Sequence, residues 1–163
     1  MSDSMRAIVM REPGDADVLE MQEVERPAPG DGDLLVRVAS SGVNRADLLQ
    51  REGRYPAPAG YSEQVLGLEY AGTVEAVGHG VDRFAVGDAV MGITGGGGYA
   101  EFVVESASTA VAAPANLDLV QVGAVPEVFM PAFDAGPAGP QCIWLVIVCH
   151  SIPTPAPRGA IRI

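Results

Sequence analysis

The stretch SGVNRADLLQREGRYP, residues 41–56, marks the place where a β-type sequence first gives way to a helical one. Residues 34–43, which lead into this stretch and overlap its start, are largely aliphatic, and their valines are typical of a strand. Residues 44–52 consist mainly of helix formers, and Asn44 is of a type that commonly caps a helix N-terminus. We therefore expect a short helix that leaves a sheet after residue 43.

Outward from this stretch, residues 1–135 contain short β-type runs separated by turn residues. Connectors such as Pro29-Gly30-Asp31-Gly32 and Gly78-His79-Gly80 hold the glycine, proline and aspartate that favour tight turns. Short strands at this spacing predict an all-β barrel or sandwich. The expected strands are residues 6–10, 18–24, 34–43, 70–77, 89–93, 99–104 and 109–112.

A second helical segment is expected to begin near Asp118. Apolar residues recur there at helical spacing, at Leu119, Val122, Val125, Val128 and Phe129. Pro126 should kink or split this helix, because a proline inside a helix removes an amide donor and clashes with the preceding turn.

The composition changes sharply after Ala135. Residues 136–163 hold five of the 13 prolines, both cysteines and the only tryptophan, whereas all 21 acidic residues lie upstream. An apolar run between two Pro-rich stretches cannot supply a strand-helix-strand unit. The sequence predicts one domain over residues 1–135 and an atypical Pro/Gly-rich tail over residues 136–163 that forms no domain.

The charge of the chain limits its partners. A formal net charge of −11, with ten arginines and no lysine, argues against nucleic acid or an anionic membrane surface as a partner. The longest apolar run has seven residues, 143–149, far short of the roughly 20 that a membrane-spanning helix needs. The N-terminus has no features of a targeting signal. We expect a cytoplasmic protein.

The cysteine and histidine content predicts no metal site. Cys142 and Cys149 match no common zinc spacing, and we expect both thiols to be reduced and free of metal. His79 and His150 are the only imidazoles, and His79 lies in a glycine-flanked turn that favours a solvated side chain.

Residues 41–56 resemble the active-site segment of the quinone oxidoreductase branch of the medium-chain dehydrogenase/reductase superfamily. The resemblance continues in the family's order through residues 66–74 (LGLEYAGTV), 86–90, 95–102 and 125–133, and covers roughly residues 5–135. It implies a mainly β, GroES-like irregular barrel of the alcohol dehydrogenase N-terminal type with one or two short helices. The family's Rossmann domain is absent from this sequence, which implies a truncated chain.

The resemblance also implies chemistry without zinc. Zinc-dependent members of the superfamily would place a cysteine and a histidine where this chain has Asn44 and Leu68, neither of which binds zinc well. The implied reaction is hydride transfer from NADPH to a small quinone or α,β-unsaturated carbonyl.

Four residues take site roles by this resemblance. Asn44 would lie beside the nicotinamide and ribose, Asp47 would hold the helix start, Tyr55 would line the substrate and cofactor cleft, and Glu69 would support them from behind. Catalytic roles then fall to Asn44, Asp47 and Tyr55, and cofactor contacts to Asn44, Tyr55 and Glu69. Purely structural roles stay open. Asn44 and Asp47 could be helix-start residues, Tyr55 a turn aromatic and Glu69 a satisfied buried acid.

Two details qualify the resemblance. The family often has a threonine facing the nicotinamide where this chain has Pro131, which offers neither a hydroxyl nor an N–H. The glycines of residues 95–100 fit the loose dinucleotide-binding pattern, but a strand is expected after them instead of a helix. We interpret them as a β-turn.

Two functions follow from different classes. The first is the family's reductase, with activity in this chain impaired by the missing cofactor domain. The second is a non-catalytic β-domain fragment or interaction module, which could self-associate through the surface that a cofactor domain normally covers. The sequence leaves open whether this chain is an active enzyme.

Overall fold

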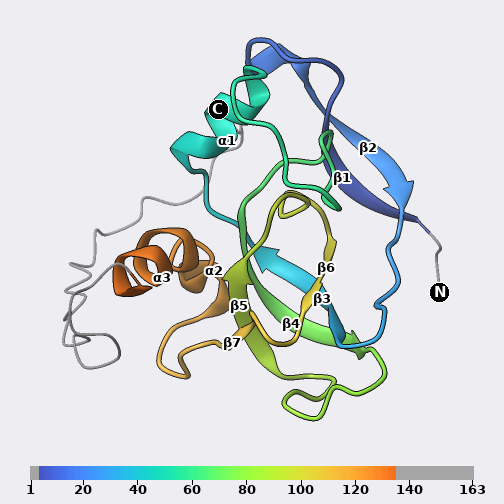
Figure 1. Ribbon diagram of the computed structural model, residues 1–163, viewed down its shortest axis with the longest axis vertical. Coiled ribbons are helices and arrows are strands. Elements are labelled where there is room, and N and C mark those ends of the chain that lie inside the picture. The colour runs from blue at the N-terminus through green and yellow to red at the C-terminus, as the bar shows by residue number, and fades with distance from the viewer. Residues whose placement is uncertain (1–3, 135–163) are drawn as a thin grey trace, which may run out of the picture.

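The computed structural model describes residues 4–134 of the chain (Figure 1). The predicted tail, with Cys142, Cys149 and His150, lies outside the described residues, so the predicted domain boundary stays a prediction. Within residues 4–134, no helix is long and apolar enough to cross a membrane.

The strands form two antiparallel sheets. A two-stranded ribbon pairs β1 (Ser4–Met10) with β2 (Leu19–Glu25). A five-stranded sheet has the order β6-β3-β4-β5-β7. Its strands are β3 (Asp33–Ser40), β4 (Glu69–Val77), β5 (Ala89–Ile93), β6 (Phe102–Ser106) and β7 (Val111–Ala112).

The mainly β fold is confirmed, but neither sheet closes into a hydrogen-bonded barrel. Isolated antiparallel bridges, Ala7 with Ala100 and Val9 with Val65, join the ribbon to the loops before β6 and β4. Ala7, Val9 and Val65 form a small buried cluster there. The ribbon is therefore attached through backbone hydrogen bonds to these loops and through side-chain packing, and not through a continuous strand ladder with the larger sheet.

Several predicted strand ends shift. The strand expected over residues 34–43 ends at Ser40, because the chain then turns so that the Ser41 hydroxyl donates to the Glu69 carbonyl. The strand expected over residues 99–104 starts only at Phe102, because the Tyr99 N–H bonds the Leu66 carbonyl and residues 99–101 meet β1 in an isolated bridge at Ala100. The strand expected from residue 18 is preceded by a short 3-10 turn, η1 (Ala16–Val18).

The main core lies under β3 and β4. Alternating residues of these strands point inward, and Leu34, Val36, Tyr70 and Val74 are almost completely buried there. Tyr70 and Val74 flank Gly72, where an added Cβ would collide with the backbone of Arg37 on β3. This glycine therefore lets the two central strands approach closely.

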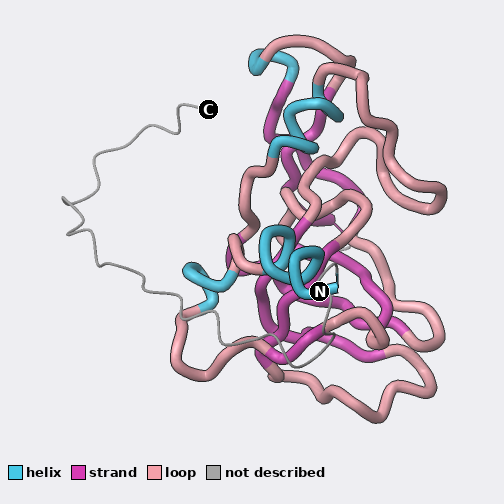
Figure 2. The backbone as a smooth tube through the Cα atoms, turned by 60° about the vertical axis from the view of Figure 1, so that its left-hand side comes forward, coloured by secondary structure: helices cyan, strands magenta, loops and turns pink. Residues whose placement is uncertain are grey.

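The helices are short; one lies beside the β1–β2 ribbon and the other two lie together near β5 (Figures 1 and 2). They are α1 (Arg45–Arg51), α2 (Leu119–Val122) and α3 (Pro126–Asp134). As predicted, Pro126 splits the second helical segment, and it does so by starting α3, where its missing N–H costs nothing. Both α2 and α3 contact β4, which brings the first turn of α3 close to the beginning of that strand.

Candidate functional site

Glu69, the first residue of β4, is 1% exposed and uses both carboxylate oxygens. Oε1 accepts a hydrogen bond from Asn44 Nδ2 at 2.7 Å. Oε2 accepts one from the backbone N–H of Glu127 in the first turn of α3 at 2.9 Å. A carboxylate at a helix N-terminus is favoured by the helix dipole. Glu69 therefore ties the segment before α1 to the start of α3.

Gly42 makes room for this carboxylate. A Cβ at Gly42 would overlap the Glu69 carboxylate and would also lie 3.2 Å from Ala124 Cα. The glycine is required here by close approach, since its φ is not in the left-handed region. The glycine of residues 41–44 (SGVN) thus makes room for the Glu69 carboxylate, which bridges Asn44 and the Glu127 amide; we call this arrangement the Glu69 bridge.

Asn44 and Asp47 meet at the start of α1. Asn44 is the N-cap, with an extended backbone, and its N–H donates to Asp47 Oδ2 at 2.7 Å. This is the helix-start arrangement that the sequence allowed for these residues. It also fixes Asn44 with its side chain turned to Glu69.

Asp47 is 2% exposed, and its Oδ1 has no partner at ordinary hydrogen-bonding geometry. Burial raises the pKa of this carboxyl, and the Asn44 N–H, the Tyr99 hydroxyl and the Gly67 and Leu68 amides oppose the rise. A buried acid whose pKa is shifted by desolvation and by specific partners marks this cluster as a candidate functional position.

Tyr99 is a part of this cluster that the sequence reasoning missed. Its hydroxyl donates to the Gly42 carbonyl at 3.2 Å. Burial, together with the nearby Asp47 and Glu69 carboxyls, raises the pKa of the phenol, so it stays a donor. The only signal available was its position at the end of the glycine-rich loop, which we interpreted as a turn.

The glycine-rich loop leads into a strand and not into a helix, as predicted, although its residues form bends instead of the predicted β-turn. Gly98 N–H and Tyr99 N–H donate to the carbonyls of Gly67 and Leu66, and β6 follows at Phe102. Gly67 has a φ of 101°, and a Cβ there would collide with Tyr99. The loop is thus folded against residues 66–68 and opens no helix.

A cavity of about 460 Å³ adjoins Glu127. Tyr55 lies at this cavity and is 44% exposed, whereas Asn44, Asp47 and Glu69 do not line it. The structure therefore brings Asn44, Asp47 and Glu69 into one cluster, and Tyr55 lies apart from it at a cavity that Leu68 and Glu127 also line. The cavity is lined by Tyr55, Pro58, Tyr61, Leu68, Ile93, Thr94, Gly95, Glu105, Thr109, Glu127 and Met130.

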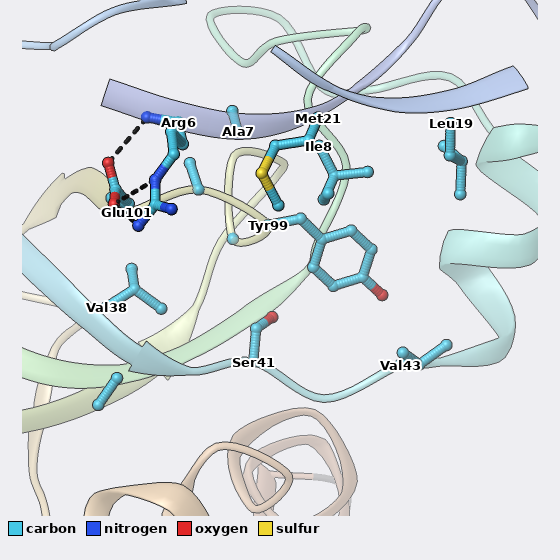
Figure 3. A pocket seen from close by; sticks show the side chains of 13 residues that line it. Arg6, Ala7, Ile8, Leu19, Met21, Val38, Ser41, Val43, Tyr99 and Glu101 are labelled. Atoms are coloured by element: carbon cyan, nitrogen blue, oxygen red, sulfur yellow. Dashed lines mark hydrogen bonds and ion pairs between the residues drawn. The ribbon is translucent and has the colours of Figure 1, made fainter. Parts of the chain in front are cut away.

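A groove of about 440 Å³ lies on the other side of the segment before α1 (Figure 3). Arg6 and Glu101 form an ion pair at one end, and Ser41 and Val43 line the wall opposite the ribbon. The intervening Gly42 lies against Glu69, as does Asn44. This segment thus separates the groove from the Glu69 bridge.

Within residues 4–134, no cluster of three or more His, Cys, Asp or Glu residues is arranged to hold a metal ion. At the positions that the resemblance links to zinc, Asn44 presents a carboxamide that is bonded to Glu69, and Leu68 presents an aliphatic side chain to the cavity. These are poor zinc donors.

Residues 30–115 match the family of the alcohol dehydrogenase GroES-like domain, and this match spans more than half of the chain. The chain belongs to this family.

Two relatives of this GroES-like domain have curated functions. Over 116 residues it is 41% identical to the mycocerosic acid synthase-like polyketide synthase of Mycobacterium tuberculosis, covering 71% of this chain and 6% of that protein. Over 113 residues it is 42% identical to the quinone oxidoreductase of Pseudomonas aeruginosa, covering 69% of this chain and 34% of that protein. The chain therefore spans a small part of either relative.

Solved structures of the superfamily share the fold. The CurK enoyl reductase superposes with a TM-score of 0.71 at 27% identity, over 80% of this chain and 41% of that chain. The predicted membership in the medium-chain dehydrogenase/reductase superfamily is confirmed. Within residues 4–134 this GroES-like domain has no parallel, doubly wound sheet of the Rossmann type.

Proposed function

We propose that this domain forms the substrate side of an oxidoreductase that transfers hydride from NADPH to a quinone or an α,β-unsaturated carbonyl, without zinc. The relationship to a quinone oxidoreductase and the structural likeness to an enoyl reductase support this class of reaction. We further propose a cytoplasmic protein whose partner is a small molecule, in keeping with its strongly negative charge.

The contact between Asn44 and Glu69 carries the proposal. One N–H of the Asn44 amide donates to Glu69, so the second N–H remains to donate to a ligand oxygen. Because Glu69 is itself fixed by the α3 amide of Glu127, the carboxamide is held in one orientation before any ligand arrives. Such preorganised donors stabilise negative charge that develops on a carbonyl oxygen during reduction.

The residues present fit the reactive end of a nicotinamide cofactor. When bound, NADPH would supply the hydride. Asn44 would hold the ring by a hydrogen bond, and Tyr55 would exclude water from the mouth of the cavity. The described residues offer no comparable binding site for the pyrophosphate of the cofactor, because the glycine-rich loop leads into β6 and not into a helix.

Cofactor binding by this chain alone should therefore be weak. In complete enzymes, binding energy from the remote phosphates helps to position the reactive ring. Titration of the purified chain with NADPH should give a dissociation constant on the order of millimolar, since only the nicotinamide end finds contacts. Low-micromolar binding would contradict this part of the proposal.

A chimera tests the reaction itself. Residues 1–134 would replace the matching N-terminal segment of the P. aeruginosa quinone oxidoreductase, and NADPH oxidation would be followed with 1,4-benzoquinone and with an enone. We expect turnover that falls about 100-fold in Asn44→Ala, the range for loss of one preorganised donor. Arg54→Ala, which removes an exposed charge that pairs with Glu52, is the matched control. A folded chimera with no turnover on either acceptor would overturn the proposal.

One observation favours the second function, a non-catalytic interaction module. Val120 on α2 and Val128 on α3 are 72% and 58% exposed, so these two helices present apolar side chains to solvent. A surface of this kind fits a partner domain or a second copy of the chain.

A further inference from the structure

One wall of the cavity beside Glu127 contains a buried acid, Glu105 on β6. Glu105 is only 5% exposed, and its Oε1 is buried without a hydrogen-bond partner. Its Oε2 accepts a hydrogen bond from the Tyr61 hydroxyl at 3.2 Å, and the Thr94 hydroxyl and the Ser106 amide also act on its pKa. A buried carboxylate that accepts so few hydrogen bonds is costly unless another donor satisfies it.

Tyr61 is held over this acid by the glycine-rich loop. A Cβ at Gly95 would collide with the Tyr61 ring, so the ring rests directly on that glycine. Tyr61 is 38% exposed and lines the cavity together with Glu105 and Thr94. The wall is thus built from three elements: the loop that carries Tyr61, the end of β5, and β6.

The charged side chains that line the cavity are all acidic. Two carboxyl groups, Glu105 and Glu127, line it, and none of its lining residues is an arginine or histidine. The remaining surface is aromatic or aliphatic, with Tyr55, Leu68 and Ile93 as large contributors. Its volume of about 460 Å³ is that of a site for a ligand of one to two rings.

We propose that Tyr61 and Glu105 form a subsite that selects uncharged, ring-containing acceptors bearing a hydrogen-bond donor such as a hydroxyl group, and that rejects acceptors bearing a carboxylate. This inference rests on the proposed function and names its class of acceptor. A ligand hydroxyl that enters beside Tyr61 gives the Glu105 carboxylate a further donor. A ligand carboxylate meets two acids in a setting of low polarity, so one of the three groups has to take up a proton.

Three naphthalenes of the same ring size test the subsite on the whole chain, without cofactor or turnover. The probes are 2-naphthol, 2-methoxynaphthalene and 2-naphthoate, titrated at mildly alkaline pH while the backbone amide signals of Thr94, Gly95 and Ser106 are followed by NMR. We expect 2-naphthol to bind about tenfold more tightly than 2-naphthoate, a modest penalty for charges near a protein surface. It should also bind more tightly than the methyl ether, which has no donor.

Two variants assign the preference to this wall. Glu105→Gln should reduce the discrimination against 2-naphthoate by about tenfold, because the nearer repulsive charge is removed. The control Glu63→Gln removes an exposed carboxylate outside the cavity and should leave the ratio unchanged. Tyr61→Phe should enlarge the advantage of 2-naphthol over the ether, since Glu105 Oε2 then loses the Tyr61 hydroxyl as a donor.

Equal affinity for 2-naphthol and 2-naphthoate in the unchanged chain would overturn the subsite. So would a discrimination that survives in a folded Glu105→Gln variant, or the absence of any shift at the cavity amides. An inactive chimera would contradict the reductase proposal and leave these binding ratios intact, so the two failures are distinguishable.

Discussion

Asn44 Nδ2 lies 2.7 Å from Glu69 Oε1, and this contact joins the residue that caps α1 to the first residue of β4. The second oxygen of the same carboxylate is bonded to the Glu127 amide. Because the carboxylate is buried and accepts from two separate elements, its removal should affect both of them.

The substitution Glu69→Gln tests this bridge. A glutamine has one acceptor oxygen where two are used, and its NH2 group would face a donor, so we expect a loss of about 2–3 kcal/mol in the free energy of unfolding. Denaturant unfolding measures it. Glu75→Gln, on the same strand but in partly exposed ion pairs with Arg26 and Arg37, should cost less than about 1 kcal/mol. Equal costs for the two variants would show that the bridge adds nothing.

Gly42→Ala should destabilise the fold by more than the addition of one methyl group usually does. The new methyl group would overlap the Glu69 carboxylate, and the resulting shift should cost about 2–3 kcal/mol of unfolding free energy. The control is Gly80→Ala, where φ is +79° but nothing lies within 4 Å of the added Cβ. That variant should cost about 1 kcal/mol, from backbone strain alone. Thermal unfolding measures both variants, and we expect the lower midpoint for Gly42→Ala. A lower midpoint for Gly80→Ala would contradict the prediction.

The pH dependence of stability should reveal Glu105. Burial raises the pKa of its carboxyl in the folded chain, and the hydroxyls of Thr94 and Tyr61 oppose the rise. A raised pKa means that the folded state binds a proton more tightly than the unfolded state does. The Glu105 contribution to stability should therefore increase as pH falls from the folded pKa to the ordinary glutamate value, and should be constant below it.

Glu105→Gln should flatten the unfolding free energy over that pH window and leave the protein equally or more stable at neutral pH. Urea titrations of the two proteins across the window measure the difference. A profile identical to that of the unchanged chain would mean that Glu105 has an ordinary pKa. Glu63→Gln, at an exposed position, serves as the control and should leave the slope as it is.

The exposed valines of α2 and α3 predict self-association. Sedimentation velocity over a range of concentrations should show a rising weight-average sedimentation coefficient, since burial of Val120 and Val128 removes apolar surface from water. Replacing both by serine should shift the association to higher concentration. A single monomeric boundary at every concentration would count against this surface as an interface.

Much of this fold could be predicted from the sequence, because its signals are local. The N-cap type of Asn44, the helix formers after it and the proline at residue 126 each act on their own neighbours. The openness of the sheets could not be predicted, since closure depends on register between distant strands.

The candidate site was predictable only in part, for a similar reason. Asn44, Asp47 and Glu69 were found through their motif, but the bridge from Glu69 to the Glu127 amide joins residues 58 positions apart. Glu105 was missed although Val103, two residues before it, lies on the same buried face of β6. A charged residue at such a position is the signal that would have marked it.

The Glu69 carboxylate has one more consequence. Since α3 is the last element that the structure describes, any displacement of this helix relative to the sheet must stretch or break the Glu127 bond, the Asn44 bond or both. The orientation of the Asn44 amide is therefore mechanically coupled to the position of α3. A displacement of the C-terminal end of α3 would therefore change the orientation of the Asn44 amide through the Glu69 side chain.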